Sequence, residues 1–296
     1  MTDQIVLEVG AEDGSLKLYR RRMLDGTFAF FTSLNAMGFE DIAGLQETSG
    51  FAASFQNAVA LLDAAPGCDW TRLHPMSVHA DYATSVLQLV ETRLSGEREH
   101  LLDRWRQLCL AELVREVAEH LRRSPERLDD VRAKIPSSDG LYAWWVRRGA
   151  IASVPSRPHP TEPGFDLLYV GIAPARASSA STIRSRVLEN HLGGNIAAST
   201  FRFTLAALLK DELHLVPLKK GKKTVLSSEQ NSQLSTWQRA NLRMTWHAAA
   251  KPWLFEAAVI AELKPPLNID DNHDDAFRST VKQARAALRR LASEQP

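Results

Sequence analysis

A cluster of residues that break helices and strands, Pro136-Ser137-Ser138-Asp139-Gly140, interrupts the chain near its middle. The net charge changes sign at the same place. Residues 1–134 hold 15 lysines and arginines against 21 aspartates and glutamates, a net of −6, whereas residues 135–296 hold 21 against 14, a net of +7. A structural break that coincides with a reversal of charge predicts two domains with different partners. We expect an N-terminal domain at 1–123, a linker at 124–139 and a C-terminal domain at 140–296.

The composition is that of a globular protein. Of the 296 residues, 44% are apolar and 24% are charged, which is enough apolar material for a core in each half. The sequence has no run of about eighteen apolar residues and no recognisable signal peptide, so we expect a cytoplasmic protein without a membrane span. Cys68 and Cys109 have no second cysteine or histidine at ligand spacing, which argues against a zinc knuckle or a disulfide framework.

The N-terminal half reads as a mixture of strands and helices. Three short β-prone runs predict an antiparallel meander, and they lie at 5–9, 15–20 and 27–31. Apolar residues at helical spacing predict helices that follow at 51–64, 78–94 and 100–121. This half is therefore predicted as α+β, and it holds no motif that carries chemistry.

The C-terminal half places two of the four tyrosines in strand-like runs. Tyr142 lies two residues after Gly140, and Tyr169 lies two residues before Gly171. Taken alone, the pair reads as core aromatics, because tyrosine is a common strand residue. A helix predicted at 181–191 places Arg184 and Arg186 near the end of the second strand.

A second amphipathic helix is opened by Lys251-Pro252 and closed by Lys264-Pro265-Pro266. It carries Glu256 close to its apolar face. A carboxylate among apolar neighbours is costly unless it is paired or binds a metal. Taken alone, Glu256 is better explained by a salt bridge on the helix.

Together, these residues resemble the GIY-YIG nuclease superfamily, which includes homing endonucleases, the excision-repair incision nuclease and some restriction enzymes. Gly140-Leu141-Tyr142 and Tyr169-Val170-Gly171 match the two signature tripeptides. Glu256 looks like the single metal-binding glutamate, and Pro266-Leu267-Asn268 resembles the close of the family domain. The resemblance covers about residues 135–270 and implies an α+β fold with a small antiparallel sheet flanked by helices.

Two features depart from the family pattern. The loop between the tyrosine strands, from Arg147 to Asp166, is longer than in compact members. Arg186 looks like the helix arginine and His191 like its partner histidine, but the two are five residues apart where an α-helical turn would give four. Arg184 therefore stays open as an alternative for the arginine.

The resemblance implies a role for each residue. Tyr142 would act as general base on the attacking water, and Tyr169 would position water or phosphate. Arg186 would stabilise the phosphate, since a guanidinium holds two oxygens at once. Glu256 would bind one Mg²⁺ or Mn²⁺ ion. His191 would assist proton transfer, and we expect Asn268 to be structural.

Three further cations are candidates for substrate binding. Arg202 lies in the first turn of a helix capped by Ser199, where it would either face the phosphates or contact water. Lys220 and Lys222 belong to a run of four lysines around Gly221 that predicts a hairpin tip. That tip is explained equally by a solvated loop and by a contact with a phosphate backbone.

The function predicted from these residues is a Mg²⁺-dependent endonuclease that acts on DNA, in defence or repair. Two alternatives stay open: RNA as the substrate, and a nucleic-acid-binding module that has lost catalysis. The acidic N-terminal domain would either bind the target or a partner protein, or restrain the basic nuclease domain.

Overall fold

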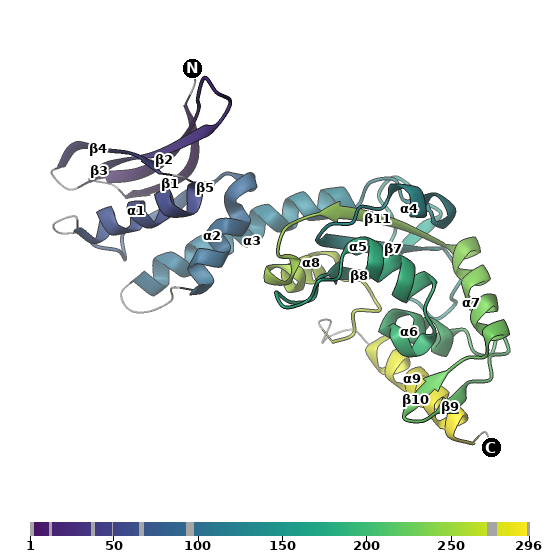
Figure 1. The fold of residues 1–296 in the computed structure, drawn as a ribbon. Coiled ribbons are helices and arrows are strands. Elements are labelled where there is room, and N and C mark those ends of the chain that lie inside the picture. Colours follow the sequence, from purple (N-terminus) through teal and green to yellow (C-terminus); the bar gives the residue numbers. More distant parts are fainter. Residues whose placement is uncertain are drawn as a thin grey trace. The chain divides into compact units, whose positions relative to one another are not determined.

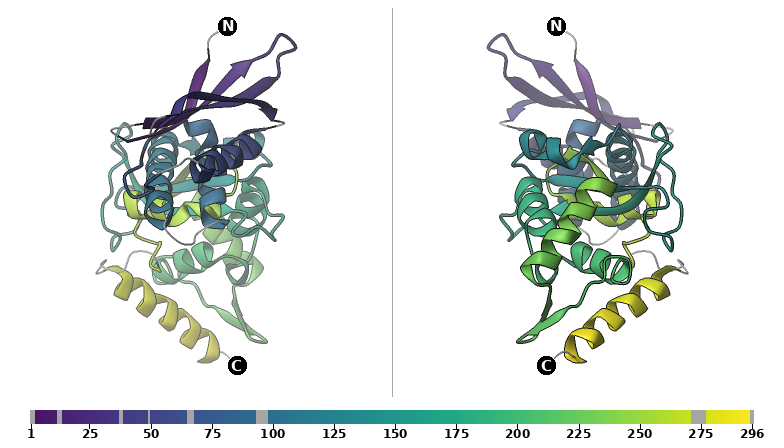
Figure 2. Two further views of the ribbon diagram at one scale, coloured as in Figure 1. Left: turned by 90° about the vertical axis from the view of Figure 1, so that its left-hand side faces the viewer. Right: turned by 90° about the vertical axis from the view of Figure 1, so that its right-hand side faces the viewer.

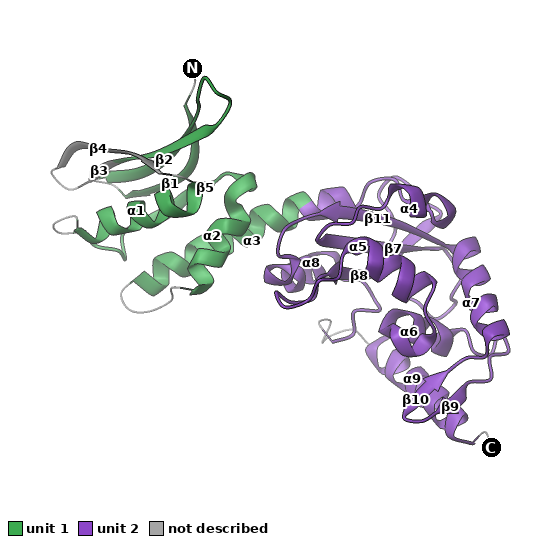
Figure 3. Cartoon of the chain, viewed as in Figure 1, with its two compact units in different colours: residues 1–116 green, residues 117–296 purple. Residues whose placement is uncertain are grey.

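The computed structural model describes residues 3–11, 14–36, 39–48, 50–64, 68–92, 98–270 and 277–294. The chain divides into two compact units, Met1–Glu116 and Val117–Pro296, and the division falls within helix α3 (Glu99–Leu121) (Figure 3). The segment 124–139, where a linker is predicted, holds strand β6 (Glu126–Arg127) and helix α4 (Leu128–Lys134). None of the described helices is both long and apolar enough to cross a membrane.

The N-terminal unit contains an antiparallel sheet of five strands in the order β4-β3-β2-β1-β5 (Figure 1). The strands are β1 (Gln4–Ala11), β2 (Gly14–Arg22), β3 (Phe28–Ala36), β4 (Phe39–Thr48) and β5 (His74–Val78). The helices are α1 (Phe51–Ala64), α2 (Ala80–Thr92) and the first part of α3. The predicted meander is confirmed as β1, β2 and β3, whereas β4 and β5 were not predicted.

Aromatic side chains hold the helices of this unit against its sheet. Phe30 of β3 contacts the rings of Phe51 and Tyr82 edge-on, with centroids 5.9 and 5.6 Å away. Phe51 and Tyr82 stack on each other at 4.5 Å, which joins α1 to α2. Such pairs add about 0.5–1.5 kcal/mol each beyond the area they bury.

The C-terminal unit is built on a four-stranded antiparallel sheet in the order β6-β11-β7-β8. Its long strands are β7 (Gly140–Arg147), β8 (Phe165–Ala173) and β11 (Leu242–Ala248). Seven of the eight residues of β7 are buried, so this strand is covered on both faces. A separate two-stranded hairpin is formed by β9 (Leu218–Lys220) and β10 (Lys223–Val225). The α+β fold class predicted for both halves is confirmed.

The helices of this unit surround the sheet. They are α4, α5 (Ile183–Ser185), the π-helix η2 (Arg186–Leu192), the 3₁₀ turns η3 (Ile196–Ala198) and η4 (Pro252–Leu254), α6 (Thr200–Leu208), α7 (Ser228–Asn241), α8 (Glu256–Leu263) and α9 (Phe277–Glu294). Helices α6 and α7 start at serine caps, where the Ser199 and Ser227 hydroxyls accept from backbone N–H groups of the first turn. Helix α9 packs along α6 and beside the hairpin (Figures 1 and 2).

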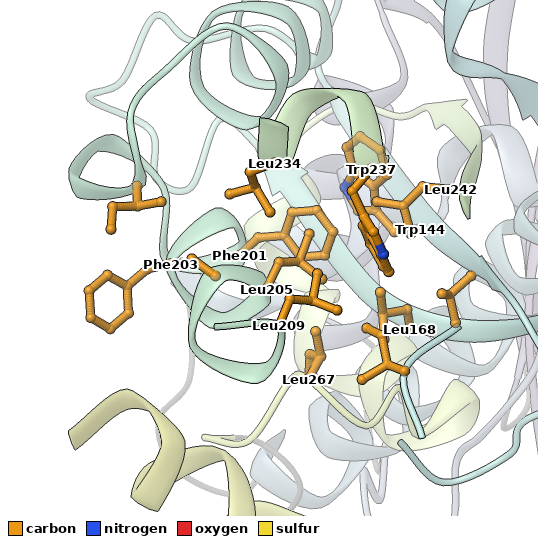
Figure 4. Close-up of a cluster of buried hydrophobic side chains, with 14 of the residues drawn as sticks. Trp144, Leu168, Phe201, Phe203, Leu205, Leu209, Leu234, Trp237, Leu242 and Leu267 are labelled. Atoms are coloured by element: carbon orange, nitrogen blue, oxygen red, sulfur yellow. The ribbon is translucent and has the colours of Figure 1, made fainter. Parts of the chain in front are cut away.

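The core of the C-terminal unit lies between the sheet and helices α6 and α7 (Figure 4). Trp144 of β7 stacks on Phe201 of α6, with ring centroids 4.9 Å apart. Leu205 and Leu234 are fully buried beside them. Truncating a buried aromatic such as Phe201 to alanine costs about 3–5 kcal/mol, so this contact fixes the position of α6 against the sheet.

Candidate active site

The two predicted tyrosines lie on one face of the sheet, on neighbouring strands. Tyr142 is directly opposite Gly171, two positions from Tyr169, so the three residues share a face. A Cβ at Gly171 would lie 2.6 Å from the Tyr142 hydroxyl oxygen, and a Cβ at Gly140 would lie 2.1 Å from the carbonyl oxygen of His247. The two glycines therefore make room for the tyrosine ring and for the neighbouring strand.

The π-helix η2 brings Arg186 and His191 together. The Gly193 N–H donates to the Leu188 carbonyl at 2.9 Å, five residues back, which is the hydrogen-bond spacing of a π-helix. In this wider turn, residues five apart lie on the same side. Arg186 and His191 accordingly line the same pocket despite a spacing that an α-helix would not accommodate.

A pocket of about 200 Å³ opens on this face of the sheet. It is lined by side chains from β8, η2, α6, α8, α9 and the segment that follows α8. The lining side chains that can be charged, or that carry a phenol or imidazole, are Tyr169, Arg186, His191, Glu256, Asp270 and Arg285. Four of the predicted catalytic residues, Tyr169, Arg186, His191 and Glu256, therefore converge here, although they are up to 87 positions apart in the chain.

Tyr142 occupies a different position from Tyr169. The Tyr142 side chain is 1% exposed and is not among the residues that line the pocket, whereas Tyr169 is half-buried and lines it. Burial raises the pKa of Tyr142 well above its ordinary value, and the neighbouring Tyr169 adds to this, while Arg186 opposes it. The Tyr142 hydroxyl is therefore close to the pocket and protonated at neutral pH.

His191 links Tyr142 to helix α6 by two hydrogen bonds. Its Nε2 lies 2.7 Å from the Tyr142 hydroxyl oxygen, and its Nδ1 lies 2.6 Å from Ser199 Oγ. Burial, followed by the charges of Arg186 and Arg202, lowers the pKa of His191 to about 3. The imidazole is therefore neutral at neutral pH, and both its ring nitrogens have partners.

Arg202 is placed differently from the sequence prediction. It is fully buried, and its guanidinium donates to the His191 carbonyl at 3.2 Å, the Asn231 carbonyl at 2.7 Å and Ser235 Oγ at 2.7 Å, and also bonds Gln238. This burial excludes a contact between Arg202 and substrate, because acceptors within the protein already bind the N–H groups of its guanidinium. Arg202 instead joins the end of η2 to helix α7, which fixes the backbone that carries His191.

Glu256 is the first residue of α8, separated from the 3₁₀ turn η4 by Phe255 alone, and its side chain is half-buried on the pocket wall. A carboxylate is favourable at this helix position because backbone N–H groups point toward it. Asn268, on the segment after α8, donates to the Val170 carbonyl at 2.8 Å and accepts from its N–H at 2.9 Å. These bonds close the free edge of β8 and hold the pocket wall beside Tyr169.

The remaining candidates lie away from the pocket. Arg184 Nη1 donates to the Ile135 carbonyl at 3.0 Å, and Arg184 is not among the lining residues, so the structure brings Arg186 rather than Arg184 to the site. Lys220 and Lys222 are exposed at the tip of the β9–β10 hairpin, as the sequence predicts for a turn at Gly221.

Sequence reasoning missed three residues of the site. Ser199 is predicted only as a helix cap; it accepts from Arg202 N–H at 3.1 Å as a cap does, but it also holds His191. Asp270 and Arg285 line the pocket from segments that carry no motif. The high density of arginine in 278–290 is a signal for a basic surface, but nothing in the sequence assigns that surface to this pocket.

Comparison with curated proteins and with solved structures found no match to this chain. The family model for the GIY-YIG catalytic domain matches residues 140–287, which extends past the resemblance seen at 135–270 into helix α9. The matched region contains both tyrosine strands, the π-helix and Glu256. Because this match covers half of the chain, the protein belongs to the GIY-YIG family and carries a nuclease-like phosphodiesterase domain.

Proposed function

We propose that this protein is a divalent-metal-dependent endonuclease that hydrolyses phosphodiester bonds in DNA. The observation that supports this most is the meeting of Arg186, Tyr169 and Glu256 in one pocket. Hydrolysis of a phosphodiester requires a positioned water, positive charge at the phosphate and a stabilised leaving oxygen. The pocket offers side chains suited to each requirement.

The donor groups in the pocket fit Mg²⁺ or Mn²⁺. Among the described residues its carboxylates are Glu256 and Asp270, it has no cysteine, and both nitrogens of its histidine are hydrogen-bonded. Mg²⁺ is usually held by one or two carboxylates, with waters and substrate phosphate at the other positions. Glu256 would hold the ion, which when bound supplies positive charge to the phosphate and the leaving oxygen.

Arg186 binds the phosphate that is attacked. Its guanidinium is carried by η2 on the pocket wall, on the same side as His191. An arginine at this place contacts two phosphate oxygens at once and stabilises the negative charge that develops on them. Groups of this kind contribute about 2.7–4 kcal/mol to transition-state stabilisation.

Tyr142 and His191 move the proton of the attacking water. We assign the Nδ1–H of His191 as donor to Ser199 Oγ, which leaves Nε2 free to accept from the Tyr142 hydroxyl. As hydroxide attacks phosphorus, the water proton passes to Tyr142 Oη and the Tyr142 proton passes to His191 Nε2. The bond from phosphorus to the leaving oxygen then breaks, that oxygen takes a proton from solvent, and His191 returns its extra proton to solvent, which restores the neutral imidazole.

Tyr169 positions the water, because its ring lines the pocket. It stacks on Phe201 with centroids 5.1 Å apart, which restricts its rotation. A held phenol can donate to a phosphate oxygen or accept from the water, so Tyr169 orients the reactants while Tyr142 receives the proton.

The N-terminal unit keeps its two proposed roles: recognition of the target or a partner protein, or restraint of the basic unit. Its residues 1–116 hold 10 lysines and arginines against 17 aspartates and glutamates, a net of −7, and residues 117–296 hold 26 against 18, a net of +8. This opposition of charge supports both roles.

A plasmid-cleavage assay on the intact protein tests the proposal. We expect Mg²⁺ to convert supercoiled plasmid to nicked or linear DNA, and EDTA to stop the conversion. An RNA of matching sequence, assayed alongside, distinguishes a DNA nuclease from an RNA nuclease. Binding of nucleic acid without cleavage in Mg²⁺ or Mn²⁺ would contradict the proposal and identify a binding module instead.

A further inference from the structure

A second hollow, which we call the basic groove, lies beside the active-site pocket. It has a volume of about 270 Å³ and is formed by the β9–β10 hairpin, the 3₁₀ turn η3, the first turn of α6 and the face of α9 that contacts α6. Its charged lining residues are Lys219, Lys222, Lys223, Arg285 and Arg289. Among the described residues, no carboxylate lines it.

The arginines of the groove are held in place by neutral partners. Arg285 Nε donates to Thr204 Oγ1 at 2.8 Å, and the Arg289 guanidinium lies over the Phe203 ring, 4.9 Å from its centroid. The two arginines are four residues apart on α9, which separates them by about 6 Å along the helix axis. Thr204 and Phe203 carry no charge, so these contacts hold the two guanidiniums in position without neutralising them.

Five like charges around one hollow repel each other, and an anion between them removes that cost. At Arg285, burial lowers the pKa of the guanidinium, and Asp270 opposes this shift while Arg289 adds to it. A single small anion would neutralise only part of this charge. A row of phosphates matches it better, because successive phosphates of one strand can each meet a different cation.

The basic groove adjoins the active-site pocket. Thr200 and Arg285 line both, so the two lie side by side at the start of α6 and on α9. A polynucleotide strand with one phosphate at Arg186 would therefore direct its neighbouring phosphates along α9 toward the hairpin.

We infer that the basic groove binds the phosphate backbone of the nucleic acid on one side of the cleaved bond. The inference rests on the proposed function for the direction of the strand, but binding in the groove needs no cleavage. It assigns the hairpin and α9 to substrate binding, and it makes this protein prefer substrates that extend beyond the cleavage site on that side.

The test measures binding of a labelled DNA duplex by fluorescence anisotropy in EDTA, at several salt concentrations. The double variant Lys222→Gln/Arg289→Gln removes one cation from the hairpin and one from α9. The control Arg132→Gln/Arg290→Gln removes two exposed charges of the same unit that do not line the groove. We expect the groove variant to bind about tenfold or more weakly than the control, with a salt slope shallower by about two.

Equal affinity and equal salt slope for the two double variants would overturn the inference, even if the protein cleaves plasmid. A loss of DNA affinity confined to the groove variant supports the inference, even if the parent protein does not cleave DNA and the proposed function is wrong. With cleavage as the readout, the groove variant is expected to raise KM for a long duplex and to leave kcat unchanged.

Discussion

The Tyr142 hydroxyl oxygen lies 2.7 Å from His191 Nε2, which joins the first tyrosine strand to the π-helix. The contact depends on the local structure around each of the two residues. Gly171 leaves space for the tyrosine ring, and the five-residue turn of η2 directs the imidazole toward it. A buried phenol thus forms one hydrogen-bonded unit with a neutral histidine of the pocket wall.

Replacing Tyr142 with phenylalanine removes the hydroxyl and keeps the ring. We expect kcat to fall about 100-fold or more with little change in KM, because general base catalysis contributes about 10²–10⁴. Steady-state kinetics on plasmid or duplex DNA measures this. Tyr19→Phe, in a strand of the N-terminal unit, is the control and should keep full activity. A Tyr142→Phe enzyme with parental kcat would remove Tyr142 from the reaction.

Substitutions at Arg186 and Arg202 should have different effects: the first should lower kcat, and the second should lower the stability of the protein. Arg186→Gln is expected to lower kcat about 10²–10³-fold and to leave the free energy of unfolding nearly unchanged, since Arg186 is half-buried on a pocket wall. Arg202→Gln leaves several buried acceptors without a donor and should destabilise the protein by about 3 kcal/mol. Urea unfolding measures the second effect. If Arg202→Gln were as stable as the parent, its assignment as a structural residue would be wrong.

Ser199 is expected to act through His191. Ser199→Ala removes the hydrogen bond at Nδ1 and the cap of α6, which costs about 1 kcal/mol of stability. Ser199→Ala should also lower kcat. Ser199→Thr keeps a hydroxyl, so it should keep the stability and the kcat of the parent protein. Ser227 caps α7 outside the pocket, so Ser227→Ala should lose stability and keep kcat. Equal kcat in the two alanine variants would contradict the role of Ser199.

The stability of the protein should depend on pH through His191. Its pKa is about 3 in the folded protein and 6.5 in the unfolded chain, so between these values the unfolded chain binds more protons. Stability is then complete above pH 6.5 and falls as the pH decreases toward 3, by about 1.4 kcal/mol per pH unit from this residue.

Urea unfolding of the parent and of His191→Gln at about pH 7 and about pH 5 measures this contribution. The free energy of unfolding should decrease less from about pH 7 to about pH 5 in His191→Gln than in the parent protein. His247, whose pKa is lowered to about 4, contributes to both proteins and cancels in the difference. Identical losses in parent and variant would show that His191 is not buried as a neutral group.

The parts of the fold that could be predicted are those with local signals. Both tyrosine strands follow from β-prone runs beside glycine, and α8 from the proline and lysine pairs that bound it. The π-helix could not be predicted, because its departure from α-helical spacing is set by the contacts of His191 rather than by local propensity.

The elements that were missed depend on tertiary contacts. Strand β11 lies between β6 and β7 in the sheet, yet its run Leu242–Ala248 holds arginine and histidine and no turn signal precedes it. Arg202 looks exposed in a first helical turn, but its acceptors come from α7, about thirty residues further along the chain. Asp270 and Arg285 likewise reach the pocket through tertiary contacts between segments that are distant in the sequence.

The most direct test of the account is the effect of Glu256→Gln on plasmid cleavage in Mg²⁺, with Glu262→Gln, an exposed carboxylate of the same helix, as the matched control. We predict that Glu256→Gln abolishes cleavage while folding and DNA binding in EDTA persist, and that Glu262→Gln cuts like the parent. Cleavage by Glu256→Gln at the parental rate would contradict the assignment of this pocket as the metal-dependent nuclease site.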